Sequence, residues 1–300
     1  MQHLLLTGAT GFLGSHLLEA LLKHGYKVTI LKRSTSDTWR IKHLLEQVSA
    51  FNVDEVAIEE AFKDDNIDCV IHTATAYGRN SQSVLEVVEA NIIFGLKLLN
   101  AAVLNEVAMF VNTDTFFNTN ANRSNYLNDY SLSKKQFTEW LKQSVSTIKI
   151  VNLNLQHVYG PNDEKSKFFP WLINQLESNC KKVSLSAGNQ TRDFIYVDDV
   201  VSAYLKILEV KNLLPRYSEF DVGTGELSSL REFVILLYNL FKKYHPENDS
   251  CLCFGDLDMY DGELQEVEVN IKPLLQLGWE IKYPKQHGLE LIILDKLRKK

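Results

Sequence analysis

The sequence predicts an α/β fold in which a doubly wound parallel sheet is joined by a smaller C-terminal lobe. Two observations support this prediction. Short apolar runs alternate with helix-like stretches through the first half of the chain, and a glycine-rich turn joins the first apolar run to the first helix-like stretch. Strands that alternate with helices form parallel crossover units, and a sheet built in this way is covered by helices on both faces.

The elements of the first half follow from their apolar patterns. Leucines at positions 17, 18, 21 and 22 have the spacing of one helical face. We expect helices at 14–24 and 84–103. We expect strands where apolar or β-branched residues run together, at 3–7, 27–31, 68–73, 109–112 and 148–155.

After Pro161 the pattern is less regular. Short apolar runs at 182–185, 194–197 and 219–222 mix with a helix-like stretch at 229–243. We therefore expect residues 161–300 to form mainly a smaller lobe. This lobe is interleaved with the domain of residues 1–160, which takes returning segments from the C-terminal half.

Composition excludes several classes of function. The chain has 300 residues, a net charge of −6 and 45 % hydrophobic residues. It lacks the basic face of a nucleic-acid binder, an uninterrupted apolar run of about eighteen residues and the pattern of a secretory signal. The four cysteines are sparse, and Cys251 and Cys253 have no second pair with which to bind zinc. We expect a cytoplasmic protein with reduced thiols and no metal site.

The glycine-rich turn reads Thr7-Gly8-Ala9-Thr10-Gly11-Phe12-Leu13-Gly14. Between a strand and a helix, Gly8 permits a tight turn, Gly11 lets the backbone approach a pyrophosphate and Gly14 allows the helix to pack closely on the sheet. Free N–H groups at the start of the helix would hold the phosphates. The alternative is a glycine-rich turn without a ligand. The sequence predicts a Rossmann-type dinucleotide-binding domain at 1–160, with cofactor contacts from Gly8, Thr10, Gly11, Phe12, Leu13 and Gly14.

The end of the second strand indicates which dinucleotide binds. NAD sites usually carry a carboxylate here, whereas an arginine accommodates the 2′-phosphate of NADP. This chain has Lys32 and Arg33 at that place, and Arg33 can offer a bidentate fork of donors to a phosphate, with Lys32 as a second charge. NADP is therefore favoured over NAD. In the alternative, both cations are solvated and Asp37 turns toward the ribose.

The segment Tyr130-Ser131-Leu132-Ser133-Lys134 places a phenol and an ammonium four residues apart, on one face of a helix. A phenol with a pKa of about 10 is a poor proton shuttle at neutral pH. A nearby ammonium favours the phenolate and brings that pKa down. The spacing alone also occurs on ordinary surface helices.

Together, the GxxGxxG turn and the Tyr-x-x-x-Lys helix resemble the extended short-chain dehydrogenase/reductase family of the NAD-dependent epimerase/dehydratase type. The resemblance covers nearly the whole chain. It implies that Tyr130 and Lys134 are catalytic and contact a nicotinamide cofactor, with a strand-end hydroxyl as the third catalytic group. Aligned with the family, Thr113 takes the hydroxyl position. Thr115 is the alternative, since both threonines point to the same side of an extended chain.

Further landmarks imply contacts with the cofactor. Thr73, Ala74 and Thr75 follow the fourth strand, where the family lines its cofactor site. Asn91 is expected either to be a buried structural group or to contact the cofactor. His157 replaces the asparagine of the family's Asn-Val-Tyr-Gly-Pro turn, and the resemblance implies contact with the substrate or the nicotinamide carboxamide.

Two positions bear on how a substrate diphosphate is held. Arg192 aligns with the family arginine that binds the substrate pyrophosphate, a role that suits its planar fork of donors. The alternative is an ion pair with Asp193 or Asp198. A second family arginine is missing where this chain reads Met259-Tyr260-Asp261-Gly262-Glu263, so Tyr260 would have to replace it.

The resemblance also narrows the reaction. The family's 4,6-dehydratases carry Thr-Asp-Glu where this chain has Thr113-Asp114-Thr115, so elimination of water is not expected, and Thr115 becomes a candidate substrate contact. Residues 112–117 and 130–140 resemble nucleotide-sugar 4-ketoreductases of the CDP-paratose and CDP-abequose synthase type. This implies NADPH-dependent reduction of a 4-keto deoxysugar carried on a nucleotide, with CDP favoured, in deoxysugar or lipopolysaccharide O-antigen biosynthesis.

Three alternatives stay open at this point. The chain could be a nucleotide-sugar epimerase that retains NAD, or a reductase of a small ketone, which would leave Arg192 structural. A non-catalytic NADP-binding regulator is the third, although such proteins usually lose the Tyr-Lys pair. Relatives commonly pair helices into a homodimer, which the resemblance implies here. The asparagine-rich segment 118–128 is expected to be a polar loop near the active site.

Overall fold

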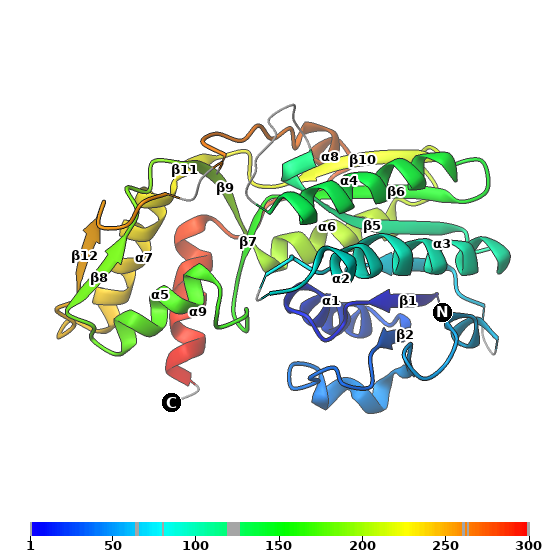
Figure 1. The fold of residues 1–300 in the computed structure, drawn as a ribbon, viewed down its shortest axis with the longest axis horizontal. Coiled ribbons are helices and arrows are strands. Elements are labelled where there is room, and N and C mark those ends of the chain that lie inside the picture. The colour runs from blue at the N-terminus through cyan, green and yellow to red at the C-terminus, as the bar shows by residue number, and fades with distance from the viewer. Residues whose placement is uncertain are drawn as a thin grey trace.

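A seven-stranded parallel sheet forms the centre of the larger domain and confirms the predicted doubly wound α/β fold (Figure 1). The computed structural model describes residues 2–63, 66–79, 81–118, 127–259, 262 and 264–298. The strand order is β10-β6-β5-β4-β1-β2-β3, with β1 (His3–Thr7), β2 (Lys27–Lys32), β3 (Ser49–Asn52), β4 (Cys69–His72), β5 (Met109–Thr115), β6 (Lys149–Leu155) and β10 (Tyr217–Val222). From β1 the chain adds β2 and β3 on one side, and then β4, β5, β6 and β10 on the other. Ligands of such sheets bind at the carboxyl ends of the strands where this direction changes, which is between β1 and β4.

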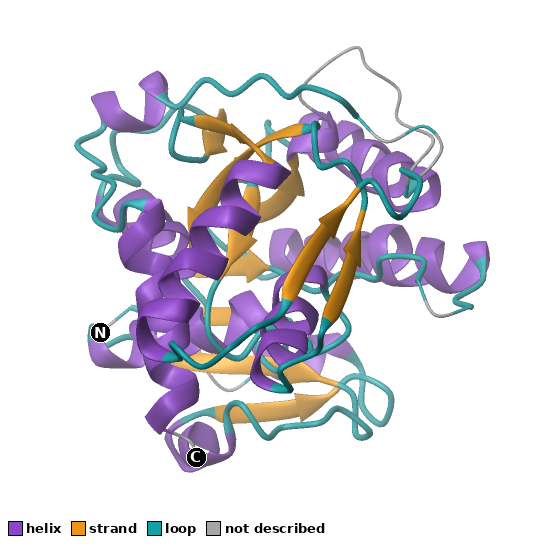
Figure 2. Cartoon of the chain, turned by 90° about the vertical axis from the view of Figure 1, so that its left-hand side faces the viewer, coloured by secondary structure: helices purple, strands orange, loops and turns teal. Residues whose placement is uncertain are grey.

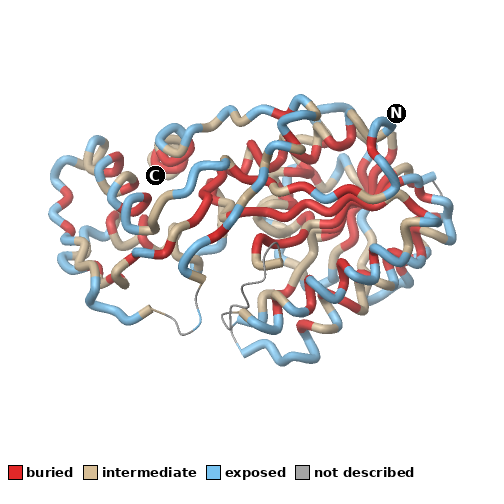
Figure 3. Tube along the Cα trace, turned by 90° about the horizontal axis from the view of Figure 1, so that it is seen from above, coloured by how far each residue is buried: buried red, intermediate tan, exposed pale blue. Residues whose placement is uncertain are grey.

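Helices cover the two faces of the sheet because neighbouring residues of each strand are apolar and point to opposite sides. Leu4 and Leu6 of β1 pack against α1 (Phe12–Lys23) and α6 (Val197–Glu209). Leu5 belongs to the opposite core, with α3 (Phe94–Leu104) and α4 (Asn128–Gln143). The strands consequently form a buried band across the molecule, whereas the outer sides of the helices are exposed (Figure 3).

Shorter elements complete this domain. The predicted helix at 84–103 consists of α2 (Val84–Val88) and α3, joined by the π-helical turn η3 (Glu89–Ile93). Segments of the C-terminal half return to it, namely α6, β10 and α8 (Lys272–Gln276). The sequence analysis missed β3 and the short 3₁₀ turns η1 (Lys42–Gln47), η2 (Ile58–Phe62) and η4 (Phe116–Asn118).

The smaller lobe combines two small sheets with helices that pack around them (Figure 2). The sheets have the orders β11-β9-β7 and β12-β8, with β7 (His157–Tyr159), β8 (Lys182–Leu185), β9 (Thr191–Tyr196), β11 (Leu227–Ser229) and β12 (Cys251–Phe254). The helices are α5 (Phe168–Glu177), α7 (Leu230–Tyr244) and α9 (Lys285–Arg298). Aromatic rings fill the core of the lobe, where the ring centroids of Phe194 and Phe233 are 4.0 Å apart.

One helical stretch needs a separate comment. Within the described part of the chain, Val84–Leu104 alone is long and apolar enough to span a membrane by length and composition, which the search for an uninterrupted apolar run did not anticipate. In the fold, Leu98 and Leu99 of this stretch are buried in the core beside the sheet, as in the core helix of a globular protein.

The outer sides of α2, α3 and α4 carry exposed apolar side chains, namely Val84, Leu85, Leu104, Leu132 and Trp140. Exposed apolar side chains of this kind are compatible with an interaction between proteins. The homodimer expected from the family resemblance stays a prediction.

Candidate active site

A cavity of about 2610 Å³ runs along the carboxyl ends of β1, β2, β4 and β5 and continues into the smaller lobe. It collects every described residue that the sequence analysis assigned to the cofactor, the substrate or the catalytic set. These are Gly8, Thr10, Gly11, Phe12, Leu13, Gly14, Lys32, Arg33, Thr73, Ala74, Thr75, Thr113, Thr115, Tyr130, Lys134, His157 and Arg192. Tyr260 lies outside the described residues, as does most of the asparagine-rich segment.

The glycine turn has no room for side chains. Gly8 has a φ of +73°, and a Cβ there would lie 2.6 Å from Thr73 Oγ1 and 2.7 Å from the Ala74 nitrogen. A Cβ on Gly14 would lie 2.0 Å from the Gly8 carbonyl oxygen. Glycine at position 8 therefore lets the turn lie against the loop after β4, and glycine at position 14 lets α1 lie against the turn itself.

At the end of β2, the two predicted cations differ in their surroundings. The Lys32 ammonium donates to Asn52 Oδ1 at 2.6 Å, whereas Arg33 is exposed at the cavity. A carboxylate is present nearby, but it is Asp54, which follows β3 and accepts hydrogen bonds from the Ser34 backbone and hydroxyl at 2.7 and 2.6 Å. These bonds lower the pKa of Asp54.

Arg40 also lines this end of the cavity, and the sequence analysis missed it. Its guanidinium stacks on Trp39, with Cζ 4.5 Å from the ring, and donates to the carbonyls of Asn162 at 2.9 Å and Thr10 at 3.2 Å. Arg40 thus joins the glycine turn to the segment that enters the smaller lobe. No local signal could reveal this role, because Asn162 lies 122 residues away in the sequence.

Tyr130 and Lys134 lie one turn apart on α4, with exposed fractions of 7 % and 3 %. Burial raises the pKa of Tyr130 well above its ordinary value and Tyr77 adds to this, whereas a hydrogen bond with Thr115 and the charge of Arg79 lower it. Burial lowers the pKa of Lys134, and the Asp114 carboxylate opposes that effect. The free site therefore holds a protonated phenol at neutral pH, which can give a proton to a ligand.

The two threonines that the sequence offered as the catalytic hydroxyl both line the cavity, but their contacts differ. Thr113 follows Met109 and Val111 on the face of β5 that packs against α6, and its hydroxyl lies 2.6 Å from the hydroxyl of Tyr204. Thr115 is the last residue of β5, where the chain turns into η4, and its hydroxyl is the one that bonds Tyr130. Both threonines lie within β5, opposite Leu153 and Leu155 of β6, so the alternation of side chains along the strand does not distinguish them.

The carboxylate of Asp114 holds three elements around the site together. Its carboxylate accepts hydrogen bonds from the Thr138 hydroxyl of α4 at 2.6 Å, from Asn118 at 2.8 Å and from Asn152 of β6 at 3.1 Å. With these donors in place, Asp114 connects β5 to α4 and to β6.

The sequence left two roles open for Asn91, and its contacts in the fold support the structural one. Its amide exchanges hydrogen bonds with the backbone of Ala76, at 2.7 Å to the nitrogen and 2.8 Å to the oxygen, and donates to Ser133 at 2.9 Å. Asn91 sits in the π-helical turn η3, a local distortion that is frequent at functional sites. It fixes the loop after β4 against the helix that carries Tyr130.

His157 and Arg192 face the cavity from the smaller lobe. The His157 ring lies between the rings of Phe116, at 4.7 Å, and Phe194, at 5.7 Å. Burial, followed by the charges of Arg192 and Arg79, lowers the pKa of His157 to about 3. This imidazole is therefore neutral at ordinary pH and does not act as a cation toward a ligand.

This depressed pKa predicts a pH dependence of stability. Since the unfolded chain binds a proton near pH 6.5 and the folded His157 does so near pH 3, stability is lost as pH falls through that window. His157→Asn should reduce the loss by up to about 1.4 kcal/mol per pH unit. Denaturant unfolding at pH 7 and pH 5 measures the difference, with the exposed His43→Asn as the control. If the free energy of unfolding of His157→Asn fell between pH 7 and pH 5 as much as that of the wild type, the His157 ring would not be buried as a neutral group.

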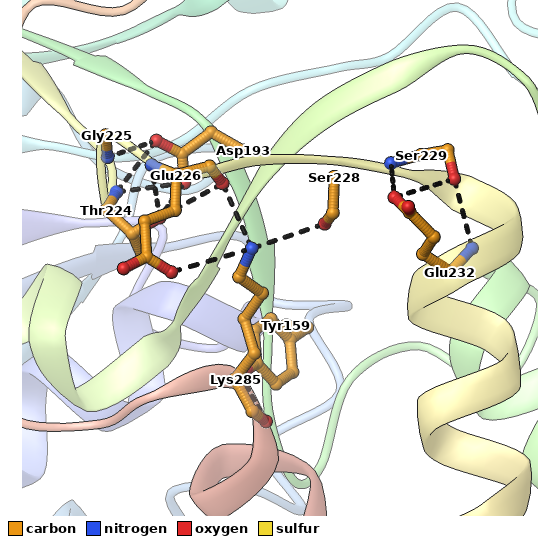
Figure 4. A network of polar contacts seen from close by, with 9 residues as sticks. All are labelled: Tyr159, Asp193, Thr224, Gly225, Glu226, Ser228, Ser229, Glu232 and Lys285. Carbon is orange, nitrogen blue, oxygen red and sulfur yellow. Dashed lines mark hydrogen bonds and ion pairs between the residues drawn. The ribbon is translucent and has the colours of Figure 1, made fainter.

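Asp193, beside Arg192, joins the two parts of the molecule (Figure 4). Its buried carboxylate accepts from the backbone nitrogens of Thr224 and Gly225, at 2.8 and 2.7 Å, and from the Thr224 hydroxyl at 2.7 Å. Lys285 donates to the neighbouring Glu226 carbonyl at 3.2 Å. The turn after β10 is thus tied to β9, which fixes the strand that carries Arg192.

The sequence left an ion pair of Arg192 with Asp193 or Asp198 open. In the fold, the Asp198 carboxylate lies 3.7 Å from the His16 ring, and the Arg192 guanidinium donates to the Thr191 carbonyl at 2.8 Å.

Among the residues that the structure describes, no group of three or more His, Cys, Asp or Glu side chains is arranged to hold a metal ion.

Comparison with known proteins places these motifs in context. The model of the NAD dependent epimerase/dehydratase family matches residues 4–223. CDP-abequose synthase of Salmonella typhimurium is 36 % identical over 296 residues, and that of Salmonella muenchen is 32 % identical over 295, with 97 % of each chain covered in both cases. A putative UDP-glucose 4-epimerase of Methanocaldococcus jannaschii is 26 % identical over 312 residues.

Solved structures are similar over the whole chain. UDP-glucose 4-epimerase of Thermotoga maritima, determined with UDP-glucose, gives a TM-score of 0.84 at 22 % identity and covers 99 % of both chains. UDP-glucose 4-epimerase of Thermus thermophilus, determined with NAD, gives 0.80 at 24 % identity, again with 99 % of both chains covered. At these identities the similarity shows the fold.

Proposed function

Because this chain belongs to the NAD-dependent epimerase/dehydratase family, as its glycine turn and Tyr-Lys pair predicted, we propose that it reduces a 4-keto deoxysugar carried on a nucleotide, with NADPH as reductant. The observation that carries the proposal is that Tyr130, Lys134 and Thr115 line the same cavity as the glycine turn. Similarity to two CDP-abequose synthases over 97 % of the chain supports a CDP-sugar substrate and a role in deoxysugar biosynthesis.

The residues of the glycine turn fit a dinucleotide. Side chains at Gly8 and Gly14 would collide with the backbone, and α1 begins at Phe12 without a side-chain cap on Gly11. Its first N–H groups are therefore suited to phosphate oxygens. The exposed Arg33 beside the end of β2 supports NADP over NAD, because a guanidinium can bind the 2′-phosphate with two parallel hydrogen bonds.

Bound along the glycine turn, NADPH would supply the hydride that the ketone carbon takes up in the proposed reaction. Tyr130 donates its proton to the ketone oxygen, which becomes the new hydroxyl, so one hydride and one proton account for the product. The Thr115 hydroxyl, which bonds Tyr130 in the free site, would turn to the ketone and donate its hydrogen bond to the same oxygen as negative charge develops on it. Lys134 stabilises the phenolate that Tyr130 becomes after giving up its proton.

An epimerase that retains NAD is the second candidate function. It is supported by the 26 % identity to a putative UDP-glucose 4-epimerase and by the fold shared with solved UDP-glucose 4-epimerases. Such an enzyme would be purified with its nicotinamide bound, whereas the proposed reductase exchanges NADP for NADPH in each turnover. A non-catalytic regulator is disfavoured because Tyr130 and Lys134 are both kept at the cavity.

Thermal unfolding with ligands tests this proposal, since a ligand stabilises the folded state according to its affinity. NADPH should raise Tm more than NADH at equal concentration, and Arg33→Ala should remove that difference. Arg216→Ala, an exposed arginine away from the cavity, is the matched control. With NADPH present, CDP should raise Tm more than UDP, dTDP or GDP. Equal shifts from NADH and NADPH, or NAD retained through purification, would contradict the reductase.

A further inference from the structure

Two cysteines lie side by side on β12, outside the residues that line the cavity. The sulfurs of Cys251 and Cys253 are 3.7 Å apart, because alternate residues of a strand point to the same side. Cys251 is exposed, and Cys253 is half-buried. The Cys253 thiol donates toward the Cys251 sulfur and also lies 3.8 Å from the Cys251 carbonyl. A donor at this place favours the thiolate on Cys251, which is the sulfur that solvent reaches.

The strand that carries the two cysteines is at the edge of a small sheet, at the end of the smaller lobe (Figure 1). Within the described part of the chain, β12 pairs with β8 alone, so that Cys251 lies opposite Lys182 and Cys253 opposite Ser184. The outer edge of such a strand has backbone groups that no neighbouring strand holds. The cysteine pair is therefore placed where a small reagent can reach it and where the backbone can bend.

The same small sheet forms part of the cavity wall. Leu185 at the end of β8 lines the cavity, as do residues 257–259, which follow β12. The Leu185 carbonyl accepts from the Gly255 nitrogen at 2.9 Å and from the Leu257 nitrogen at 3.1 Å, which holds the two segments together. A change in the course of β12 would therefore alter the wall of the cavity.

A disulfide between the two cysteines would shorten β12. Alternate Cα atoms of a strand are about 6.6 Å apart, whereas a disulfide usually joins Cα atoms about 5.5–6 Å apart. The sulfurs would also have to approach from 3.7 Å to a bond of about 2 Å. The ladder bond from the Cys251 nitrogen to the Lys181 carbonyl, which is 3.1 Å long, lies at this place. The intact ladder thus favours the open dithiol, and strained disulfides of this kind are the labile ones.

We propose that Cys251 and Cys253 form a thiol–disulfide exchange site, and that its closure bends β12 and disturbs the cavity wall at residues 257–259. The co-reactant is a small disulfide of the oxidised glutathione class. This inference goes beyond the proposed reaction and does not depend on it.

The exchange takes place in two steps. The Cys251 thiolate attacks one sulfur of the small disulfide and displaces a thiolate, which leaves a mixed disulfide on Cys251. Cys253 then loses its proton, attacks the Cys251 sulfur and displaces the second thiolate. The two cysteines give up two electrons and two protons, and the small disulfide becomes two thiols.

The first test follows the thiols of the full chain in glutathione buffers of increasing oxidised share, by alkylation and peptide mass spectrometry. Cys251 and Cys253 should lose their free thiols together and gain an internal disulfide without bound glutathione. Cys253→Ser should stop with glutathione bound to Cys251, because the second attacking sulfur is missing. The control is Cys180→Ser, which should behave like the wild type, since the Cys180 thiol contacts the Lys182 carbonyl at 3.4 Å.

Hydrogen exchange tests the effect on the cavity wall without a substrate. Oxidation of the wild type should speed exchange at the Gly255 and Leu257 amides roughly tenfold, the factor for losing one backbone hydrogen bond. A reducing agent should reverse the change, and Cys251→Ser should show none. A wild type that keeps both thiols free, a disulfide that includes Cys180, or an internal disulfide with unchanged exchange at these amides would overturn the inference.

Discussion

Tyr130→Phe is expected to abolish reduction of the sugar ketone while NADPH still binds. The substitution removes one oxygen from a buried ring and with it the proton that the phenol gives to the ketone. General acid catalysis contributes roughly 10²- to 10⁴-fold to a rate, so kcat should fall by at least about a hundredfold. Loss of NADPH absorbance measures kcat, and quenching of its fluorescence measures the dissociation constant, which should stay within about threefold.

The control for this experiment is Tyr238→Phe. Tyr238 lies on α7, outside the cavity, and its hydroxyl donates to the Ser250 carbonyl at 2.6 Å. Removing that hydroxyl should leave kcat unchanged at a modest loss of stability. If Tyr130→Phe kept more than a tenth of the wild-type rate, another group would have to donate the proton.

Thr115→Val should lower kcat, whereas Thr113→Val should lower the stability of the fold. The Thr115 hydroxyl lies beside Tyr130 and is the proposed donor to the developing oxyanion. Its loss should therefore lower kcat by roughly 10²-fold or more. The Thr113 hydroxyl bonds Tyr204 in the core beside α6. Its loss should leave kcat within a few-fold of the wild type but destabilise the fold by about 1–3 kcal/mol, because a buried hydroxyl is left unpaired.

Steady-state kinetics and denaturant unfolding on both variants measure these two effects. Since valine has nearly the shape of threonine, the comparison isolates the hydroxyl at each position. A large loss of kcat in Thr113→Val together with a normal Thr115→Val would restore the assignment that alignment with the family gives.

The features that the sequence predicted well are local ones. The glycine turn and the Tyr130–Lys134 pair depend on residues within one turn or one helix, so their spacing alone defines their geometry. The strands of the sheet are short apolar runs, and their alternation with helices was sufficient to predict the doubly wound fold. The returning segments were expected, although the pairing of β10 with β6 depends on contacts between residues about 70 positions apart.

The features that were missed or misassigned depend on distant residues. Which threonine meets the phenol is decided by Tyr204, 91 residues after Thr113. Arg40 acquires its role from the carbonyls of Thr10 and Asn162. None of these pairings has a sequence spacing that a motif could describe, so they emerged from the tertiary structure alone.

The central claim, that this cavity brings a hydride and the Tyr130 proton to one ketone, is tested most directly by following the hydride. The enzyme would be incubated with NADPH deuterated at nicotinamide C4, on each face in turn, and a CDP-4-keto-deoxyhexose, and the sugar product analysed by mass spectrometry and NMR. We predict that one of the two labelled forms leaves one deuterium on sugar C4, with one NADPH consumed per product. A sugar without deuterium from either form, or one that is epimerised without net consumption of NADPH, would contradict the account.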